Sequence, residues 1–255
     1  MIDTHSHIYL QQFDQDRFEV FARAVKAGVK AIFMPAIDFG SIAQMQKLHH
    51  PDIQFYKMAG LHPCEVELLD ADFEINLHDF CTRDDIYGVG ETGLDYYWST
   101  DHVEEQKRSL HIHCRVAKAV KKPIILHNRE STSDLLDLVE GEQDGSLTGI
   151  WHCFNGSVDE GKRALDLGLH LGIGGVVTFK NGGVDKTAAQ LPLGKMVLET
   201  DAPYLSPTPK RGTRNEPAFI SYTAQKLADI FLMRVEEVIE KTSATAWELF
   251  KIPMD

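Results

Sequence analysis

The stretch PIILHNRE, residues 123–130, is a short apolar run that ends in a histidine and further polar residues. A strand that is buried on both faces reads as a continuous apolar run, which is typical of parallel sheets. Similar runs recur along the whole chain. They predict eight strands, at residues 1–8, 29–35, 54–62, 86–91, 123–127, 148–152, 169–175 and 195–201.

Helical segments separate most of these predicted strands. In RFEVFARAVKAGVK, residues 17–30, Phe18, Phe21 and Val25 have helical spacing, and Gly28 suits a helix C-cap. The same periodicity predicts helices at residues 103–120 and 158–167 and terminal helices over 218–250 that cover the barrel. Alternating strands and helices predict the α/β class. The simplest arrangement is one (β/α)8 TIM barrel formed as a single domain by residues 1–255.

The composition limits the function classes. The chain has 255 residues and a formal net charge of −12 at pH 7. It lacks a run of about 18 apolar residues and a basic start followed by an apolar stretch, so we expect neither a membrane span nor a secretory signal. Four cysteines without a CxxC pair predict reduced thiols and a cytoplasmic location. The acidic charge argues against non-specific coating of nucleic acid, and no obligate protein partner is evident.

Two histidines stand one residue apart in IDTHSHIY, residues 2–9. Residues i and i+2 of a strand point to the same face, so His5 and His7 on the first strand can share one ion. His111 and His113 have the same spacing within a predicted helix, where about 200° of rotation separates their side chains. We therefore expect a ligand pair at the start of the chain and no such pair in the middle.

Polar residues of ligand type also stand where other apolar runs end. Catalytic residues of such barrels lie at the C-terminal ends of the strands, so we expect these side chains to converge there. Imidazoles and carboxylates together suit one or two divalent ions. The alternative is that each residue caps its own strand independently. The predicted ligands are His5, His7, Glu91, His127, His152 and Asp201.

The segments DTHSH, GLHPCE, GETGLDYY, ILHNRE, WHCFNGS and LETDAPYL follow one another in this order. Together they resemble the TatD family of metal-dependent deoxyribonucleases, within the wider amidohydrolase-type barrels. The resemblance implies a (β/α)8 fold and a divalent-metal site built from the six predicted ligands, with Glu91 bridging two ions when both are present. Members of the family are described as Mg²⁺-dependent nucleases that act on DNA from the 3′ end, and some relatives cleave aminoacyl esters from tRNA.

The expected chemistry is hydrolysis of a phosphodiester by metal-activated water. We assign Asp201 as the general base, Glu91 as the bridging carboxylate, and His62 as a contact to the substrate phosphate or a proton carrier. For His62 the alternative is an ordinary loop histidine. The metal stays open among Mg²⁺, Zn²⁺ and Mn²⁺, because imidazoles favour a transition metal and the family description favours Mg²⁺.

Substrate contacts are predicted on two segments. In TPKRGTRNEP, residues 208–217, Asn215 suits an N-cap and Pro217 suits the first position of a helix. Arg211 and Arg214 beside that helix start would clamp a substrate phosphate; a surface salt-bridge cluster is the alternative. The second segment contributes Asn128 and Arg129, which follow the predicted ligand His127 and are expected to meet the substrate.

Three further features keep two interpretations each. Tyr96, Tyr97 and Trp98 can stack on unpaired bases or pack a loop. Asp95 supports the site or stabilises a turn, and Glu199 orients a ligand or forms a structural ion pair. Cys153 is expected to point away from its neighbour His152, to the opposite strand face.

Other function classes remain. The same metal site could polarise a carbonyl, which would make the chain a hydrolase of an aminoacyl-tRNA ester or of a small-molecule amide or lactone. A non-catalytic metal-binding or scaffold protein is the third possibility. The predicted substrate is a DNA end or nucleotide phosphate, and end-directed action on single strands suits the acidic charge better than tracking along duplex DNA.

Overall fold

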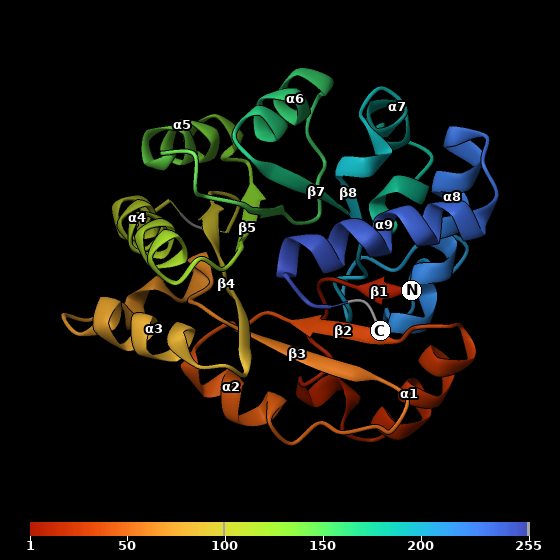
Figure 1. Ribbon diagram of the computed structural model, residues 1–255, viewed down its shortest axis with the longest axis horizontal. Coiled ribbons are helices and arrows are strands. Elements are labelled where there is room, and N and C mark those ends of the chain that lie inside the picture. The colour runs from red at the N-terminus through yellow and green to blue at the C-terminus, as the bar shows by residue number, and fades with distance from the viewer. Residues whose placement is uncertain (99, 254–255) are drawn as a thin grey trace.

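Eight parallel strands, each next to its sequence neighbours, form the centre of the protein (Figure 1). The structure is a computed structural model that describes residues 1–98 and 100–253. Every neighbouring pair from β1 to β8 is parallel. The strands are β1 (Ile2–Asp3), β2 (Ala31–Met34), β3 (Gln54–Ala59), β4 (Ile86–Asp95), β5 (Ile124–Arg129), β6 (Gly149–Trp151), β7 (Leu169–Ile173) and β8 (Met196–Leu198).

Backbone hydrogen bonds close the barrel between its first and last strands. The amide of Thr4 donates to Leu198 O at 3.0 Å, Asp201 N donates to His5 O at 2.8 Å, and His7 N donates to Ala202 O at 2.8 Å. All of these bonds lie beyond the regular part of β1, which ends at Asp3 and not at Ile8 as expected. Three predicted ligands, His5, His7 and Asp201, therefore lie side by side along the seam that closes the sheet.

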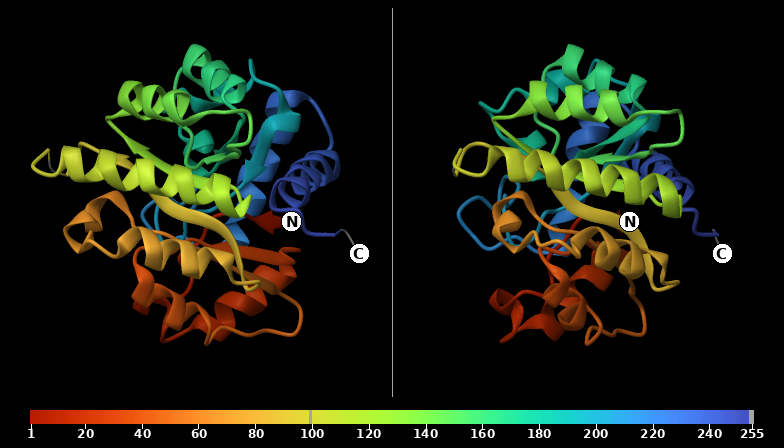
Figure 2. Two further views of the ribbon diagram at one scale, coloured as in Figure 1. Left: turned by 60° about the vertical axis from the view of Figure 1, so that its left-hand side comes forward. Right: turned by 90° about the vertical axis from the view of Figure 1, so that its left-hand side faces the viewer.

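Helices surround the strands (Figure 2). In its views α3 and α4 run next to each other along the outside of the sheet. Because the buried strands are apolar on both faces, their outer side chains form one large core with the helices. The α-helices are α1 (Arg17–Lys26), α2 (Phe39–Met45), α3 (Phe73–Thr82), α4 (Val103–Val120), α5 (Thr132–Glu142), α6 (Val158–Asp166), α7 (Val184–Ala188), α8 (Ile220–Phe231) and α9 (Val235–Phe250).

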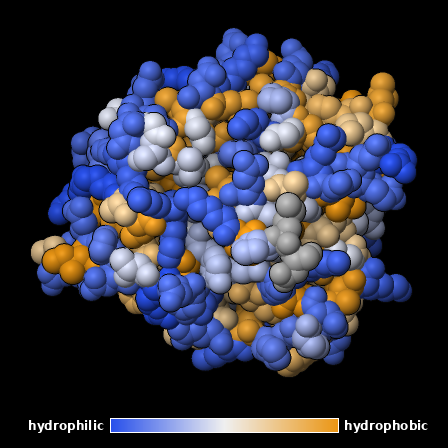
Figure 3. Space-filling view, in the orientation of Figure 1, coloured by the Kyte–Doolittle hydropathy of each residue, from blue (hydrophilic) through white to orange (hydrophobic). Residues whose placement is uncertain are grey.

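The amino-terminal end of the barrel is closed by α9, which crosses the near side in Figure 1. Leu249 and Phe250 pack on inward-facing strand residues, and the ring of Phe250 stacks on Phe33 at 3.9 Å between centroids. On the face that Figure 3 shows, hydrophilic residues predominate and hydrophobic ones are interspersed. With this end filled by side chains, the opposite end is the one open to a functional site.

Two local expectations differ from the structure. The strand that carries Glu91 continues for four more residues, so Glu91 lies inside β4 and not at its end. Asn215 does not cap a helix: the short 3-10 helix η5 (Pro217–Phe219) begins after Glu216, although Pro217 does occupy its first position. The buried Asn215 amide instead donates to the carbonyls of Thr200 and Tyr204, because these loop groups have no ladder partner.

None of the helices that the structure describes has both the length and the apolar content needed to cross a bilayer.

Candidate metal centre

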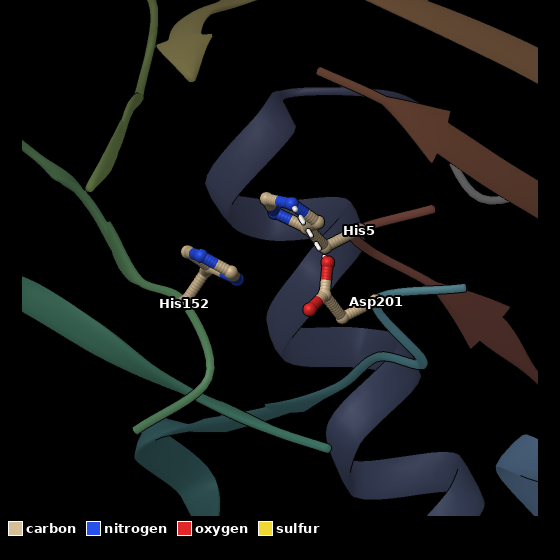
Figure 4. Close-up of side chains that lie close together, drawn as sticks. All are labelled: His5, His152 and Asp201. Atoms are coloured by element: carbon tan, nitrogen blue, oxygen red, sulfur yellow. Dashed lines mark ion pairs between the residues drawn. The ribbon is translucent and has the colours of Figure 1, made fainter. Parts of the chain in front are cut away.

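The closing seam and β4 together bring four potential ligand atoms to the carboxyl end of the barrel. Nε2 of His5 lies 3.2 Å from Nε2 of His7, and both nitrogens face Oε2 of Glu91, at 3.2 and 3.4 Å. Oδ1 of Asp201 lies 3.7 Å from the first nitrogen and 3.6 Å from the second. Figure 4 shows Asp201 reaching His5, with the ring of His152 beside them. All four side chains are buried or nearly so.

A second group forms around the other oxygen of the same carboxylate. Oε1 of Glu91 lies 3.0 Å from Nδ1 of His127 and 2.9 Å from Nε2 of His152, and these two nitrogens are 3.4 Å apart. The ring of His152 also stacks on that of His5, with centroids 3.8 Å apart. The structure thus brings all six predicted ligands together, and Glu91 stands between the two groups.

The spacing and the chemistry of these atoms fit a divalent cation. Ligand atoms that lie about 2.1 Å from one ion are about 3.0 to 3.4 Å apart in octahedral or tetrahedral coordination. The separations here, from 2.9 to 3.7 Å, fall close to that range. Within the described residues, Oε2 of Glu91 is buried and makes no hydrogen bond. A buried carboxylate oxygen without a hydrogen bond is costly, and a cation would satisfy it.

Tyr9 determines which nitrogen of His7 is free. Its hydroxyl donates to the carbonyl oxygen of Pro35 at 2.8 Å and lies 3.1 Å from Nδ1 of His7. A hydroxyl carries one proton, so it accepts the second hydrogen bond from Nδ1–H of the imidazole. The lone pair of His7 is then on Nε2, which faces Glu91 and His5. This is the orientation that a metal ligand requires.

The position of the ring proton also distinguishes His62 from the predicted ligands, although His62 lies beside them. Nε2 of His62 is 3.7 Å from Oε1 of Glu91. Its Nδ1 accepts a hydrogen bond from the amide of Cys64 at 3.1 Å, so the ring proton is on Nε2. Burial also lowers the pKa of His62 to about 3, which keeps the ring neutral. His62 therefore offers an N–H donor to the centre and no lone pair.

Two carboxylates, Asp95 and Glu199, lie behind the predicted ligands His127 and His152. Oδ2 of Asp95 lies 2.9 Å from Nε2 of His127, and its Oδ1 accepts from the amides of Tyr97 and Trp98. Both interpretations of Asp95, site support and turn stabilisation, therefore apply. Glu199 Oε1 accepts a hydrogen bond from the amide of Cys153 and lies 3.6 Å from Nδ1 of His152, which is too far for a hydrogen bond, so both interpretations of Glu199 remain.

Burial and neighbouring charges shift the pKa values of the acidic and imidazole groups in the centre. Burial alone would raise the pKa of Glu91, but the imidazoles of His152, His5 and His62 hold it well below its usual range. Burial would lower the pKa of His152, yet Glu91 and Glu199 raise it well above its ordinary value. Burial raises the pKa of Asp201 to about 6 against the opposing effect of His152 and His7.

Asp3 and Tyr9 belong to this centre and were not predicted. Asp3 is fully buried and accepts hydrogen bonds from the amide and hydroxyl of Thr200 and from the amide of His5. Its two oxygens thereby tie the seam together behind the ligands. The signal was present, because Asp3, His5, His7 and Tyr9 are spaced two residues apart and continue one alternation.

The predicted substrate residues occupy different positions. Arg214 forms a double hydrogen bond with Asp16, at 2.8 and 2.7 Å, and its guanidinium lies over the ring of Phe13. Asn128 donates to Thr132 and accepts from Ser131, so its amide holds the turn after β5. Because Arg214 is paired with Asp16, the predicted phosphate clamp of Arg211 and Arg214 is not formed in this structure.

Arg211 and Arg129 keep more open positions. Arg211 is exposed and lies over the ring of Phe179, beside a surface cavity of about 450 Å³ that is also lined by Lys180. Arg129 lies over Tyr97 near the metal centre. These two arginines remain available for a substrate.

Two further sequence predictions concern Cys153 and the pair His111 and His113. Cys153 does not follow strand alternation, because its backbone has a φ of +47° and the strand ends at Trp151. Burial and the charges of Asp201 and Glu199 raise the pKa of its thiol well above the usual value, so it is not an activated nucleophile. His111 and His113 diverge as expected: the first contacts Glu142 and the second accepts from Leu61 N.

Known proteins resemble this chain along nearly its whole length. Residues 2–251 match the family described as TatD related DNase. The uncharacterized metal-dependent hydrolase YabD of Bacillus subtilis is 32% identical over 254 residues, covering 99% of both chains. The protein named 3′-5′ ssDNA/RNA exonuclease TatD of Citrobacter koseri is 30% identical over 234 residues, covering 89% of this chain and 90% of the relative. The crystal structure of YJJV, a TatD homolog from Escherichia coli K12, matches with a TM-score of 0.89 at 28% identity, covering 99% of this chain and 98% of that one.

Proposed function

This chain belongs to the family of TatD-related DNases and is a metal-dependent hydrolase, and from this we propose that it cleaves phosphodiester bonds at the 3′ ends of single-stranded DNA. The observation that carries the proposal is the position of Glu91 between two groups of imidazoles. The name of the Citrobacter koseri relative supports the choice of substrate. We place the protein in the cytoplasm, in keeping with its four unpaired cysteines.

The residues divide into two ligand groups that share one carboxylate. In this proposal His5, His7 and Asp201 would hold one ion, His127 and His152 would hold a second, and Glu91 would contribute to both. Paired divalent ions offset the charge of a phosphodiester and lower the pKa of a coordinated water. The four imidazoles favour Zn²⁺ or Mn²⁺ over Mg²⁺, which prefers oxygen ligands.

Proton transfer is assigned to groups of the chain itself. Asp201 is nearly buried and has a second carboxylate oxygen beside the one that faces His5 and His7, so it can accept the proton of the attacking water. His62 presents a neutral N–H towards the centre and donates a hydrogen bond to a phosphate oxygen. Arg211 contacts a phosphate further along the strand, because its guanidinium is exposed and no carboxylate pairs with it among the described residues.

A substrate panel tests the proposal. The purified protein is incubated with single-stranded DNA, duplex DNA, an aminoacyl-tRNA and a set of carboxylic esters and lactones, each with Zn²⁺, Mn²⁺, Mg²⁺ or a chelator. We expect cleavage from the 3′ end of single strands that the chelator abolishes and that Glu91→Gln lacks. Hydrolysis of the esters or of aminoacyl-tRNA without cleavage of DNA would replace this substrate. Absence of all hydrolysis in metal-loaded protein would contradict an enzymatic role.

A further inference from the structure

Two aromatic side chains stand exposed directly after β4. Tyr97 is 49% exposed and Trp98 is 69% exposed, and their rings meet edge to face with centroids 4.9 Å apart. Large aromatic side chains are mostly buried in folded proteins, because each buries a large apolar area. An exposed pair next to the polar residues of a metal centre therefore needs a reason.

One carboxylate connects this pair to the metal centre. Oδ1 of Asp95 accepts hydrogen bonds from the amides of Tyr97 at 3.0 Å and Trp98 at 3.3 Å. Its other oxygen lies 2.9 Å from Nε2 of His127. The Asp95 side chain thus contacts the backbone of both aromatic residues and also the predicted ligand His127. A single residue therefore fixes the position of the aromatic pair relative to that ligand.

Arg129 adds a cation to the aromatic pair. Its guanidinium carbon lies 3.5 Å from the ring centroid of Tyr97 and 5.2 Å from that of Trp98. Arg129 follows His127 by two residues in β5, so both side chains leave the same face of the strand. Within residues 1–98 and 100–253, no carboxylate forms an ion pair with Arg129.

We propose that Tyr97, Trp98 and Arg129 form a nucleobase shelf, which binds one unpaired base of the strand whose phosphodiester lies at the metal centre. The inference rests on the proposed function and assigns its preference for single strands to a definite surface. The exposed indole of Trp98 supplies the stacking face, Tyr97 supports it edge-on, and Arg129 supplies a planar cation that attracts the phosphate next to the base.

Loop packing alone does not account for this arrangement. A tryptophan that served to pack the loop would bury most of its ring, whereas Trp98 leaves more than two thirds of its surface open. Every base has a π-face, so such a shelf tolerates any sequence. A base within a duplex keeps its faces stacked on its neighbours and cannot enter. The shelf therefore selects for frayed or single-stranded ends without reading their sequence.

The test measures the binding of single-stranded oligonucleotides to metal-loaded protein. The oligonucleotides carry a fluorescent label at the 5′ end and phosphorothioate linkages at the 3′ end, which slow hydrolysis, and a series replaces one terminal nucleotide at a time by an abasic unit. We expect Trp98→Ala to weaken binding of the complete oligonucleotide roughly 5- to 150-fold, since stacking contributes about 1–3 kcal/mol per base. At one position of the abasic series the wild-type protein should bind as weakly as Trp98→Ala.

Two further variants complete the design. Trp98→Phe keeps an aromatic face and should retain most of the affinity. Phe18→Ala removes an aromatic side chain that is 77% exposed on α1, and it should bind like the wild type. Circular dichroism and the Tm of each variant establish that the barrel is intact.

The outcomes separate the shelf from the proposed function. Equal affinity of wild type and Trp98→Ala for the whole series would overturn the shelf, and so would an equal loss at every abasic position. If wild-type protein cleaves unprotected DNA while Trp98→Ala cleaves and binds it equally well, the shelf fails and the proposed function stands. If the base-dependent loss of binding appears but no DNA is cleaved, the shelf stands and the proposed function fails.

Discussion

The hydroxyl of Tyr9 holds His7 by its outer nitrogen, 3.1 Å away, and leaves the inner nitrogen facing Glu91. Tyr9 itself lies outside the two ligand groups, and its proton is committed to the carbonyl oxygen of Pro35. Tyr9 therefore orients a predicted ligand without belonging to either ligand group. It can be changed without altering the charge of the centre.

Tyr9→Phe should weaken metal binding. The variant keeps the ring packing and removes the acceptor for Nδ1–H of His7, so the imidazole loses the contact that fixes its tautomer. Partners of this kind typically account for about 10- to 100-fold in metal affinity. Competition with a chromophoric chelator measures the change. Tyr96→Phe is the matched control, because it removes a hydroxyl that donates to Asp134 and contacts no ligand; a similar loss in both variants would contradict the role of Tyr9.

The sequence predicted the barrel and the convergence of the six candidate ligands at one end of it, because both follow from short-range patterns. Apolar runs gave the strands, and alternation placed His5 and His7 on one side even though β1 itself ends at Asp3. The same alternation reaches Tyr9, so its role was within reach. Only the pairing of β1 with β8 shows that these ligands meet Asp201, which is distant in the chain.

Other features had no short-range signal. Arg214 pairs with Asp16, which is 198 residues away, so its charge appeared free in the sequence. The left-handed backbone of Cys153 turns its side chain out of the expected alternation. The proton on Nε2 of His62 depends on a hydrogen bond from Cys64, which exists only in the folded loop. Such contacts are set by tertiary structure and not by periodicity.

Asp201→Asn should reduce turnover far more than substrate binding. The amide keeps the shape of the side chain and one oxygen that can face His5 and His7, but it cannot accept the proton of the attacking water. We expect kcat to fall roughly 10²- to 10⁴-fold. Metal content and the Kd for a phosphorothioate oligonucleotide are measured in the same preparation. Turnover close to that of the wild type would show that another group is the base.

The pH dependence of stability should include a contribution from His113. This buried ring donates from Nδ1 to Ser109 O and accepts from Leu61 N, and burial lowers its pKa to about 4. The unfolded chain binds the proton near pH 6.5, so the folded state loses stability as the pH falls from about 6.5 to 4. Between pH 7 and pH 5 this loss amounts to about 2 kcal/mol.

His113→Gln removes that titration. Urea unfolding at pH 7 and pH 5, with chelator present so that the ligand histidines contribute equally, compares the variant with the wild type. The variant should lose about 2 kcal/mol less free energy of unfolding over this interval, although it is less stable at pH 7. An equally steep decline in both proteins would show that His113 becomes protonated without cost.

Arg211 and Arg214 should have separate effects, although the sequence suggested one clamp. Arg211→Ala removes an exposed cation that stacks on Phe179, so the slope of log K against log salt for single-stranded DNA should become shallower by about 0.7. Arg214→Ala breaks the pair with Asp16 that joins the start of α1 to the loop after β8. It should lower the free energy of unfolding by about 1 kcal/mol or less and leave the salt slope unchanged. Fluorescence anisotropy at several salt concentrations and urea unfolding of both variants measure these effects, and a shallower slope in Arg214→Ala would mean that Asp16 releases this arginine to the phosphate when DNA binds.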